Sequence, residues 1–272
     1  MRPVGELSPD EARLLSGLIF DLDDTLLDHG VLTEEAYSAL FRLREAGLRL
    51  IACTGRPAGW GEVIARQWPI DAAIAENGAV AFVRAKAGEV DRALIPKTLG
   101  ARDERRQRRI ELLSLADELV ARFPDAALAD DNDLRLTDVT IDVGEHRRVK
   151  AEDAEAMHAI AHARGVRTLQ SSVHLHLSLE TADKASGSVR LLWELFGEDP
   201  TRARQRYAFA GDSGNDAACF AAFTSTFGVA NVRSHLARLS VPPRFVASAP
   251  MGRGFAEIAA QIASHRRSPP PG

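Results

Sequence analysis

The segment Gly17-Leu18-Ile19-Phe20-Asp21-Leu22-Asp23-Asp24-Thr25 passes from an apolar run directly into an acidic stretch. A short apolar run bounded by polar residues is typical of a strand that is buried on both faces of a parallel sheet. Residues two apart in an extended segment project to the same side, so the carboxylates of Asp21 and Asp23 are expected to face one site. The segment therefore predicts a buried strand that ends in a pair of acids.

The chain on either side of the middle third repeats this pattern. Residues 33–46 predict a helix with Thr33 as its N-cap and Gly47 as its stop, and residues 48–53 predict a second strand. A strand–helix–strand order predicts a right-handed crossover in an open parallel sheet. The C-terminal part resumes the alternation, with helices expected at 184–196, 215–223 and 254–264 and strands at 207–210, 226–230 and 245–247.

The middle of the chain follows a different pattern. Asn77-Gly78 between two apolar stretches is a strong hairpin signal. Beyond it, helices are expected at 100–122 and 150–163, a strand or strand pair at 134–143, and two short strands at 166–179. These elements do not alternate as in a doubly wound sheet, which favours a separate α+β insert. We predict a doubly wound, Rossmann-like α/β core formed by residues 1–82 and 184–272, and an α+β cap formed by residues 83–183.

Composition and charge narrow the functional classes. Hydrophobic residues make up 45% of the 272 residues and charged residues 26%, which is typical of globular chains. The net charge of −4 argues against a nucleic-acid partner. Cys53 and Cys219 are expected to be buried thiols in a reducing compartment. There is no signal-like segment and no apolar run that could span a bilayer, so we expect a cytoplasmic protein without membrane contact, as a monomer or homodimer.

Polar clusters follow the predicted strands where ligands bind in open α/β sheets. Asp21 and Asp23 can divide the work, one as an ionised nucleophile and the other as a general acid and base. Thr54-Gly55-Arg56 follows the second strand, and its hydroxyl and backbone N–H groups are good donors to phosphate oxygens. Each cluster alone could be an ordinary turn, but their order along one sheet predicts a shared site.

Two further clusters complete this set. Lys184 follows Asp183 at a predicted helix start, where its charge and the helix N-terminus both favour an anion. The segment Gly211-Asp212-Ser213-Gly214-Asn215-Asp216 follows the strand at 207–210. Asp212 and Asp216 offer the hard oxygen ligands that Mg²⁺ prefers.

With these four motifs the sequence resembles the haloacid dehalogenase superfamily of phosphohydrolases. The Asn77-Gly78-Ala79 hairpin is similar to the Cof-type, class IIB subfamily, which includes sucrose-phosphate and mannosyl-3-phosphoglycerate phosphatases. The resemblance implies an aspartyl-phosphate mechanism with Asp21 as nucleophile and Asp23 as general acid and base. It also implies Mg²⁺ as cofactor, with Asp21, the carbonyl of Asp23, Asp212 and Asp216 on the metal side. The expected phosphate- or substrate-binding residues are Thr54, Gly55, Arg56, Lys184 and Asn215.

The expected function is Mg²⁺-dependent hydrolysis of a small phosphorylated metabolite, a sugar phosphate or a glycosyl-phosphoglycerate. One alternative is a phosphotransferase or mutase that uses the same aspartyl phosphate. Mutases of the superfamily typically carry the cap between the first two motifs, whereas here the insert follows Thr54. The other alternative is a catalytically silent sensor or binding protein, although Asp21, Asp23, Thr54, Lys184 and Asp212 are all present.

Three residues near these motifs have open roles. His174 and His176 alternate on one predicted strand and share a face. They could contact substrate from the cap or form a half-exposed strand face, and we favour the second interpretation. Arg56 could reach substrate or form a structural salt bridge, and the sequence does not separate the two.

Overall fold

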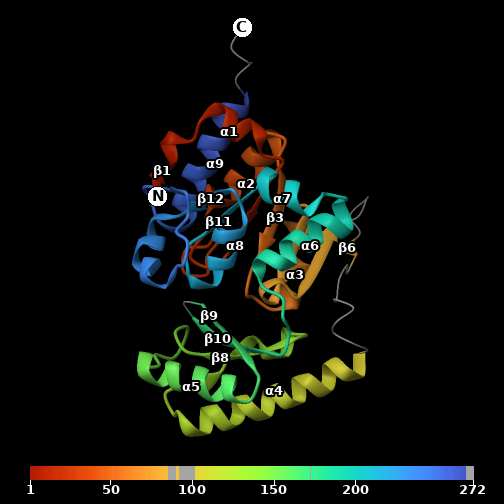
Figure 1. Ribbon diagram of the computed structural model, residues 1–272, viewed down its shortest axis with the longest axis vertical. Coiled ribbons are helices and arrows are strands. Elements are labelled where there is room, and N and C mark those ends of the chain that lie inside the picture. Colours follow the sequence, from red (N-terminus) through yellow and green to blue (C-terminus); the bar gives the residue numbers. More distant parts are fainter. Residues whose placement is uncertain (85–89, 92–101, 172, 268–272) are drawn as a thin grey trace.

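The computed structural model describes residues 1–84, 90–91, 102–171 and 173–267. Figure 1 shows two units. The larger unit is a sheet with its helices, and the smaller unit below it is a sheet with α4 and α5. Among the described residues, no helix combines the length and apolar character that crossing a bilayer requires. Residues 100 and 101 of the predicted helix at 100–122 lie outside the described part of the chain.

The larger sheet is mainly parallel. Its strands pair in parallel up to β4, and β5 and β6 are added antiparallel. The strand order is β1 (Arg2–Pro3), β13 (Phe245–Val246), β12 (Ser225–Gly228), β11 (Tyr207–Gly211), β2 (Gly17–Phe20), β3 (Arg49–Cys53), β4 (Ala72–Ala75), β5 (Val80–Arg84) and β6 (Val90–Asp91).

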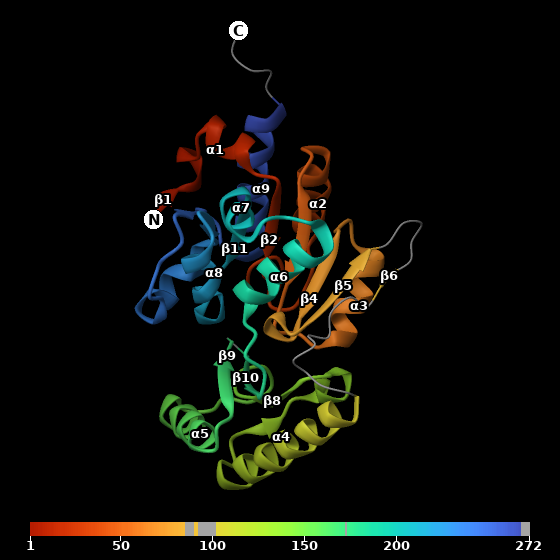
Figure 2. The same ribbon diagram turned by 45° about the vertical axis from the view of Figure 1, so that its right-hand side comes forward.

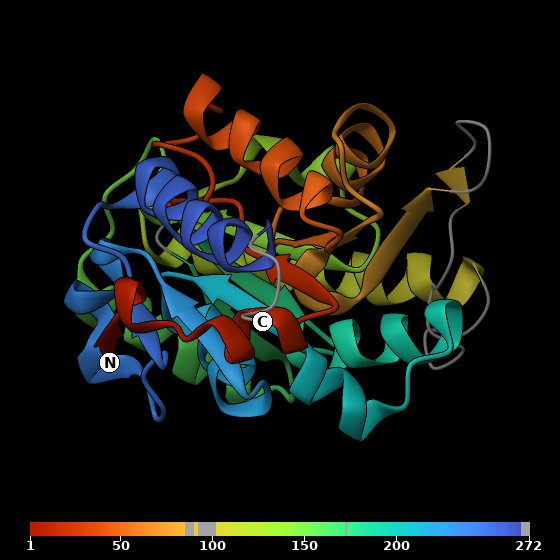
Figure 3. The ribbon, with the colours of Figure 1, turned by 90° about the horizontal axis from the view of Figure 1, so that it is seen from above.

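Helices cover both faces of this sheet, as Figure 3 shows. One face packs on α1 (Pro9–Leu14), α2 (Glu34–Glu45), α3 (Ala58–Gln67) and α9 (Met251–Arg267). The other face packs on α6 (Lys184–Phe196), α7 (Pro200–Arg206) and α8 (Ala217–Ala222). Short 3-10 helices lie at Val4–Glu6, Gly214–Asp216 and Ala230–Arg238.

The buried strand β2 shows why the fold follows from the sequence. Leu18 and Phe20 contribute to the apolar cluster on one face of the sheet, and Ile19 contributes to the cluster on the other. A strand covered on both faces must be apolar throughout, because side chains alternate between the faces. The predicted doubly wound α/β core with an added α+β unit is confirmed.

The predicted hairpin at Asn77-Gly78 is also confirmed, with a turn of four residues between β4 and β5. Its 3-10 turn, η2 (Glu76–Gly78), places Asn77 at φ 52° and Gly78 at φ 105°. A Cβ on Gly78 would lie 2.1 Å from the carbonyl oxygen of Asp183. Glycine is therefore needed here, and its absent side chain lets the turn pack against the start of α6.

The smaller unit is an antiparallel sheet with helices on one side (Figure 2). The strand order is β7 (Ala127–Leu128), β8 (Asp138–Asp142), β10 (His174–Ser178) and β9 (Arg167–Gln170). The helices α4 (Arg102–Arg122) and α5 (Ala151–Ala163) share an apolar core with this sheet, and the 3-10 helix η5 (Asp130–Leu134) precedes β8. We refer to this unit as the cap.

The junction of the two units affects the predicted division at residue 83. Strand β5 runs to Arg84, and both β5 and β6 pair within the larger sheet. Residues 83–84 and 90–91 therefore extend the larger sheet. We propose to retain the division into core and cap, and to count these two strands with the core.

Candidate active site

The predicted site residues meet because parallel strands end at one edge of the sheet. Phe20 of β2 pairs with Ala52 of β3 and with Ala210 of β11. The residues that follow these three positions leave the sheet side by side. This register brings the segments after Phe20, Ala52 and Ala210 together, although they are far apart in the sequence.

Lys184 is the cation at the centre of this site. Its side chain is fully buried, and its Nζ lies 2.8 Å from Asp21 Oδ1 and 2.7 Å from Asp216 Oδ1. Burial would lower the pKa of Lys184, but the two carboxylates raise it. Lys184 is therefore held as an ammonium ion. Asp183 accepts a hydrogen bond from Ser186 N and caps α6, which fixes the place where Lys184 begins the helix.

Three buried carboxylates surround this lysine. Asp21, Asp212 and Asp216 each offer an oxygen, and these atoms lie within 4.8 Å of one another. Burial raises the pKa of Asp21 to about 8, opposed by Lys184 and reinforced by Asp216. Burial together with Asp216 and Asp21 raises the pKa of Asp212 to about 9. The carboxylate oxygens of these three acids lie close together, and the charge of Lys184 does not balance them. Such a group of hard oxygen ligands fits a divalent cation such as Mg²⁺.

Neighbouring polar groups orient two of these acids. Asp212 accepts hydrogen bonds from Thr25 Oγ1 at 3.2 Å and from Asn231 Nδ2 at 2.9 Å. Asp216 Oδ2 accepts from the backbone N–H groups of Asp212 and Ser213, which leaves Oδ1 for the lysine. Thr25 and Asn231 were not predicted as site residues from the sequence. Asn231 follows β12 closely, so the rule that found the other strand ends could have found it.

The second motif lies beside the first. Thr54 is fully buried, and its Oγ1 accepts a hydrogen bond from Arg56 N at 3.0 Å. Arg56 donates from Nε to both carboxylate oxygens of Asp23, at 2.9 and 3.1 Å, and stacks 4.3 Å from the ring centre of Trp60. The salt bridge that the sequence left open is present. It engages the carboxylate of Asp23, which is not part of the three-acid cluster.

A pocket opens above these residues. Asp21, Asp23, Gly55, Arg56 and Asn215 line it from the core side, whereas Thr54, Lys184, Asp212 and Asp216 lie beneath its surface. Asn215 Oδ1 accepts a hydrogen bond from Ser213 Oγ at 2.8 Å. The space open to water is ≈ 20 Å³, about the room of one molecule. In this arrangement of cap and core, little free space remains above Asp21.

The comparisons with known proteins support the fold. Residues 18–99 match the family model of haloacid dehalogenase-like hydrolases. The chain has the haloacid dehalogenase-like fold. No curated protein sequence matches it significantly. The predicted resemblance is confirmed by this match over residues 18–99, and solved structures share the fold over nearly the whole chain.

Three solved structures illustrate the similarity. The sucrose-phosphatase of Synechocystis sp. has a TM-score of 0.63 at 18% identity, covering 92% of this chain and 98% of its own. The C-terminal domain of trehalose-6-phosphate phosphatase from C. albicans has a TM-score of 0.69 at 11% identity, covering 97% and 99%. A sugar phosphatase of subclass IIB of the superfamily has a TM-score of 0.58 at 16% identity, covering 91% and 97%.

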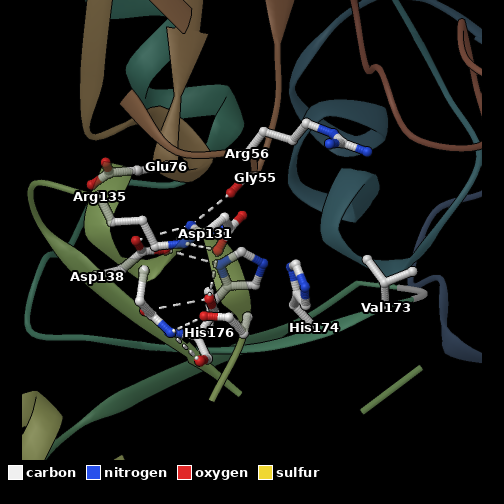
Figure 4. Close-up of polar contacts among 12 residues, drawn as sticks. Gly55, Arg56, Glu76, Asp131, Arg135, Asp138, Val173, His174 and His176 are labelled. Atoms are coloured by element: carbon white, nitrogen blue, oxygen red, sulfur yellow. Dashed lines mark hydrogen bonds and ion pairs between the residues drawn. The ribbon is translucent and has the colours of Figure 1, made fainter. Parts of the chain in front are cut away.

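In this haloacid dehalogenase-like chain, cap residues form the far wall of the pocket (Figure 4). His174 and His176 are only 8% and 2% exposed, and both line the pocket. The interpretation of a half-exposed strand face was therefore wrong, because the cap packs this face of β10 against the core. A Cβ on Gly55 would lie 3.2 Å from His176 Cε1, so the close approach favours glycine.

A buried arginine links the cap to the second motif. Arg135 donates to the carbonyl oxygen of Gly55 at 3.0 Å and to both carboxylate oxygens of Asp138 at 3.0 and 3.1 Å. It also donates to Asp131 at 2.8 and 2.9 Å. From the core side, Glu76 accepts from the backbone N–H groups of Leu136 and Thr137. These contacts join cap and core beside the pocket.

Proposed function

We propose that the chain is a Mg²⁺-dependent phosphatase that hydrolyses a small phosphorylated metabolite through an aspartyl phosphate on Asp21. The observation that carries this proposal is the position of Asp21, which lines the pocket while Lys184 and two further acids lie beneath it. Solved structures with this fold include a sucrose-phosphatase and a trehalose-6-phosphate phosphatase. Their names support a phosphorylated sugar as the substrate class.

In the first step Asp21 attacks phosphorus and displaces the alkoxide. Lys184 neutralises part of the charge on the phosphoryl oxygens and keeps the carboxylate of Asp21 in place. Mg²⁺, when held by Asp21, Asp212, Asp216 and the carbonyl of Asp23, would supply the remaining positive charge. Thr54 and the backbone N–H of Gly55 are proposed as phosphate donors, with Asn215 at the side of the pocket.

Asp23 serves as the general acid and then the general base. Its carboxylate lies in the same pocket as Asp21, two residues further along the chain. Once protonated, Asp23 donates to the leaving oxygen; as a carboxylate it then accepts a proton from the water that hydrolyses the aspartyl phosphate. The ion pair with Arg56 holds the side chain of Asp23 in place at the pocket.

The cap controls access to this chemistry. Its present position leaves room for about one water molecule, so the cap must open for substrate and close again before reaction. Closure excludes bulk water from the first step. The cytoplasmic location and the monomeric or homodimeric state stay predictions.

The test is phosphate release from p-nitrophenyl phosphate, with and without Mg²⁺, by the wild type and by Asp21→Asn. We expect Asp21→Asn to fold as judged by circular dichroism and to lose roughly 10⁴-fold or more in kcat, because the nucleophile is gone. The matched control Asp10→Asn changes a carboxylate that is 94% exposed and should keep full activity. Wild-type protein that is inactive with Mg²⁺ would overturn the proposal, as would an active Asp21→Asn.

A further inference from the structure

The cap wall of the active-site pocket, which we call the roof, has a distinct chemical character. It consists of Asp131, Glu145, Ser171, Val173, His174 and His176. Two of these residues are acids, and none of the described residues in the roof is a lysine or an arginine. The leaving group of the substrate must lie between the roof and Asp21, so the roof determines which alcohols fit.

Among the described residues that line the pocket, the one guanidinium comes from the core and is already paired. Arg56 binds the carboxylate of Asp23 through two nitrogens, the closest contact being 2.6 Å. Burial would lower the pKa of Arg56, but Asp23, Glu145 and Asp131 raise it. The field of the two roof acids therefore reaches the core side of the pocket. An anionic leaving group would meet these acids, and the described lining residues offer it no arginine or lysine without an acidic partner.

The layer behind the roof does not reverse this charge. Arg135 is fully buried and divides its donors between Asp131 and Asp138, as Figure 4 shows. Burial would raise the pKa of Asp138, but Arg135 and His176 lower it to about 2. Burial lowers the pKa of His176, which favours the neutral ring. Arg135 therefore pairs with Asp131 and Asp138, and Glu145 is a further acid of the roof.

The ring atom Nε2 of His174 can form a hydrogen bond with a ligand in the pocket. Its side chain is 10% exposed and lines the pocket. Among the described residues, its Nε2 has no hydrogen-bond partner, although Glu145 Oε2 lies 2.9 Å away. That contact has the distance of an ion pair. A buried polar atom without a partner is costly, and a hydroxyl group of the ligand would satisfy it.

We propose that the roof selects an uncharged polyol as leaving group, its hydroxyls bound by Asp131, Glu145 and His174, and rejects leaving groups that carry a carboxylate or a second phosphate. Carboxylate oxygens accept hydrogen bonds from sugar hydroxyls, and the same oxygens repel an anion. This inference rests on the proposed phosphatase function. Of the two substrate classes expected from the sequence, it selects the sugar phosphate over the glycosyl-phosphoglycerate.

A matched pair of substrates tests this inference. Glucitol 6-phosphate and 6-phosphogluconate differ only in a terminal hydroxymethyl group against a carboxylate. With Mg²⁺ present, we expect kcat/KM to be at least about tenfold higher for glucitol 6-phosphate, because like charges across an interface are strongly unfavourable. Equal or higher kcat/KM for 6-phosphogluconate overturns the inference. So does turnover of p-nitrophenyl phosphate with neither sugar phosphate accepted.

Two variants assign the discrimination to the roof. Glu145→Gln keeps the shape of a side chain that is 38% exposed and removes its charge. The ratio of kcat/KM for glucitol 6-phosphate to kcat/KM for 6-phosphogluconate should therefore fall roughly fivefold. Glu152→Gln is the control, since Glu152 is exposed on α5 and does not line the pocket. An unchanged preference in Glu145→Gln overturns the assignment to this residue. If p-nitrophenyl phosphate is also inert with the wild type, the phosphatase proposal itself has failed, and the inference fails with it.

Discussion

Two buried charge clusters lie on opposite sides of the pocket, and they differ in how far their acids are neutralised. The core cluster has Lys184 among Asp21, Asp212 and Asp216. Burial raises the pKa of Asp21 to about 8 and that of Asp212 to about 9. The core cluster is thus short of positive charge and suited to bind a cation.

The cap cluster has Arg135 between Asp131 and Asp138, with His176 alongside. Here the pKa of Asp138 is about 2, since Arg135 and His176 outweigh its burial. Lys184 and Arg135 each contact two carboxylates, but the core cluster contains a third acid, Asp212. The planar guanidinium of Arg135 also offers more donors than the compact ammonium of Lys184. Buried acids thus form a ligand site where there are too few cations to neutralise them. Where hydrogen-bond donors are sufficient, buried acids instead hold two parts of the fold together.

The largest expected effect is that of metal removal on the core cluster. With EDTA, phosphatase activity should fall on the order of 10⁴-fold, because the divalent ion contributes several kcal/mol to phosphoryl transfer. Added Mg²⁺ should also raise the Tm of the wild type, since it binds only the folded state. The variant Asp212→Asn, which lacks one of the three acids, should show a smaller rise. Full activity in EDTA and a Tm independent of Mg²⁺ would contradict a metal role.

In the cap cluster, the corresponding change is Arg135→Met. It leaves Asp131 and Asp138 buried without their donor, which should lower the free energy of unfolding by about 3–5 kcal/mol. Urea unfolding measures this loss. The control Arg164→Met breaks an exposed pair with Glu118 and should leave the stability nearly unchanged. Equal stabilities of the two variants would contradict the structural role of Arg135.

The two clusters also differ in how well the sequence predicts them. Asp21, Thr54 and Asp212 each follow an apolar strand, and parallel strands end at one edge, so their meeting could be expected. Asn231 follows β12 and obeys the same rule, although it was not predicted as a site residue. No helix was predicted at α1, although Ser8 and Glu11 form a capping box at its start.

The cap cluster could not be predicted in this way. Arg135, Asp131 and Asp138 lie within eight residues, but only the tertiary fold turns all three inward. Likewise, the alternation of His174 and His176 shows that they share a face, but not that this face packs on the core. Docking of one unit on another depends on surfaces from distant segments, and local periodicity carries no information about it.

An acid titration probes the cap cluster without removing Arg135. The folded pKa of Asp138, about 2, lies below its ordinary value of 3.8. This group therefore contributes stability above pH 4, which is lost as the pH falls toward 2, by about 2 kcal/mol in all. The free energy of unfolding of Asp138→Asn should lack this component. The difference in the free energy of unfolding between wild type and variant should become smaller below pH 4. A difference that does not change with pH would refute the role of Asp138.

The smallest expected effect concerns a single hydrogen bond in the core cluster. Thr25 is fully buried, and its Oγ1 donates to Asp212 Oδ1 at 3.2 Å, which orients one of the three acids. Thr25→Val keeps the shape of the side chain and removes the hydrogen-bond donor, which should lower the free energy of unfolding by about 0.5–1.5 kcal/mol. If Asp212 binds the metal, the Mg²⁺ concentration for half-maximal activity should rise roughly two- to tenfold, with kcat at saturating Mg²⁺ little changed. Thr33→Val, at the half-buried N-cap of α2, is the control and should affect stability without affecting the Mg²⁺ response. A Thr25 variant with an unchanged Mg²⁺ response but a lower kcat would instead mean that Asp212 positions the substrate.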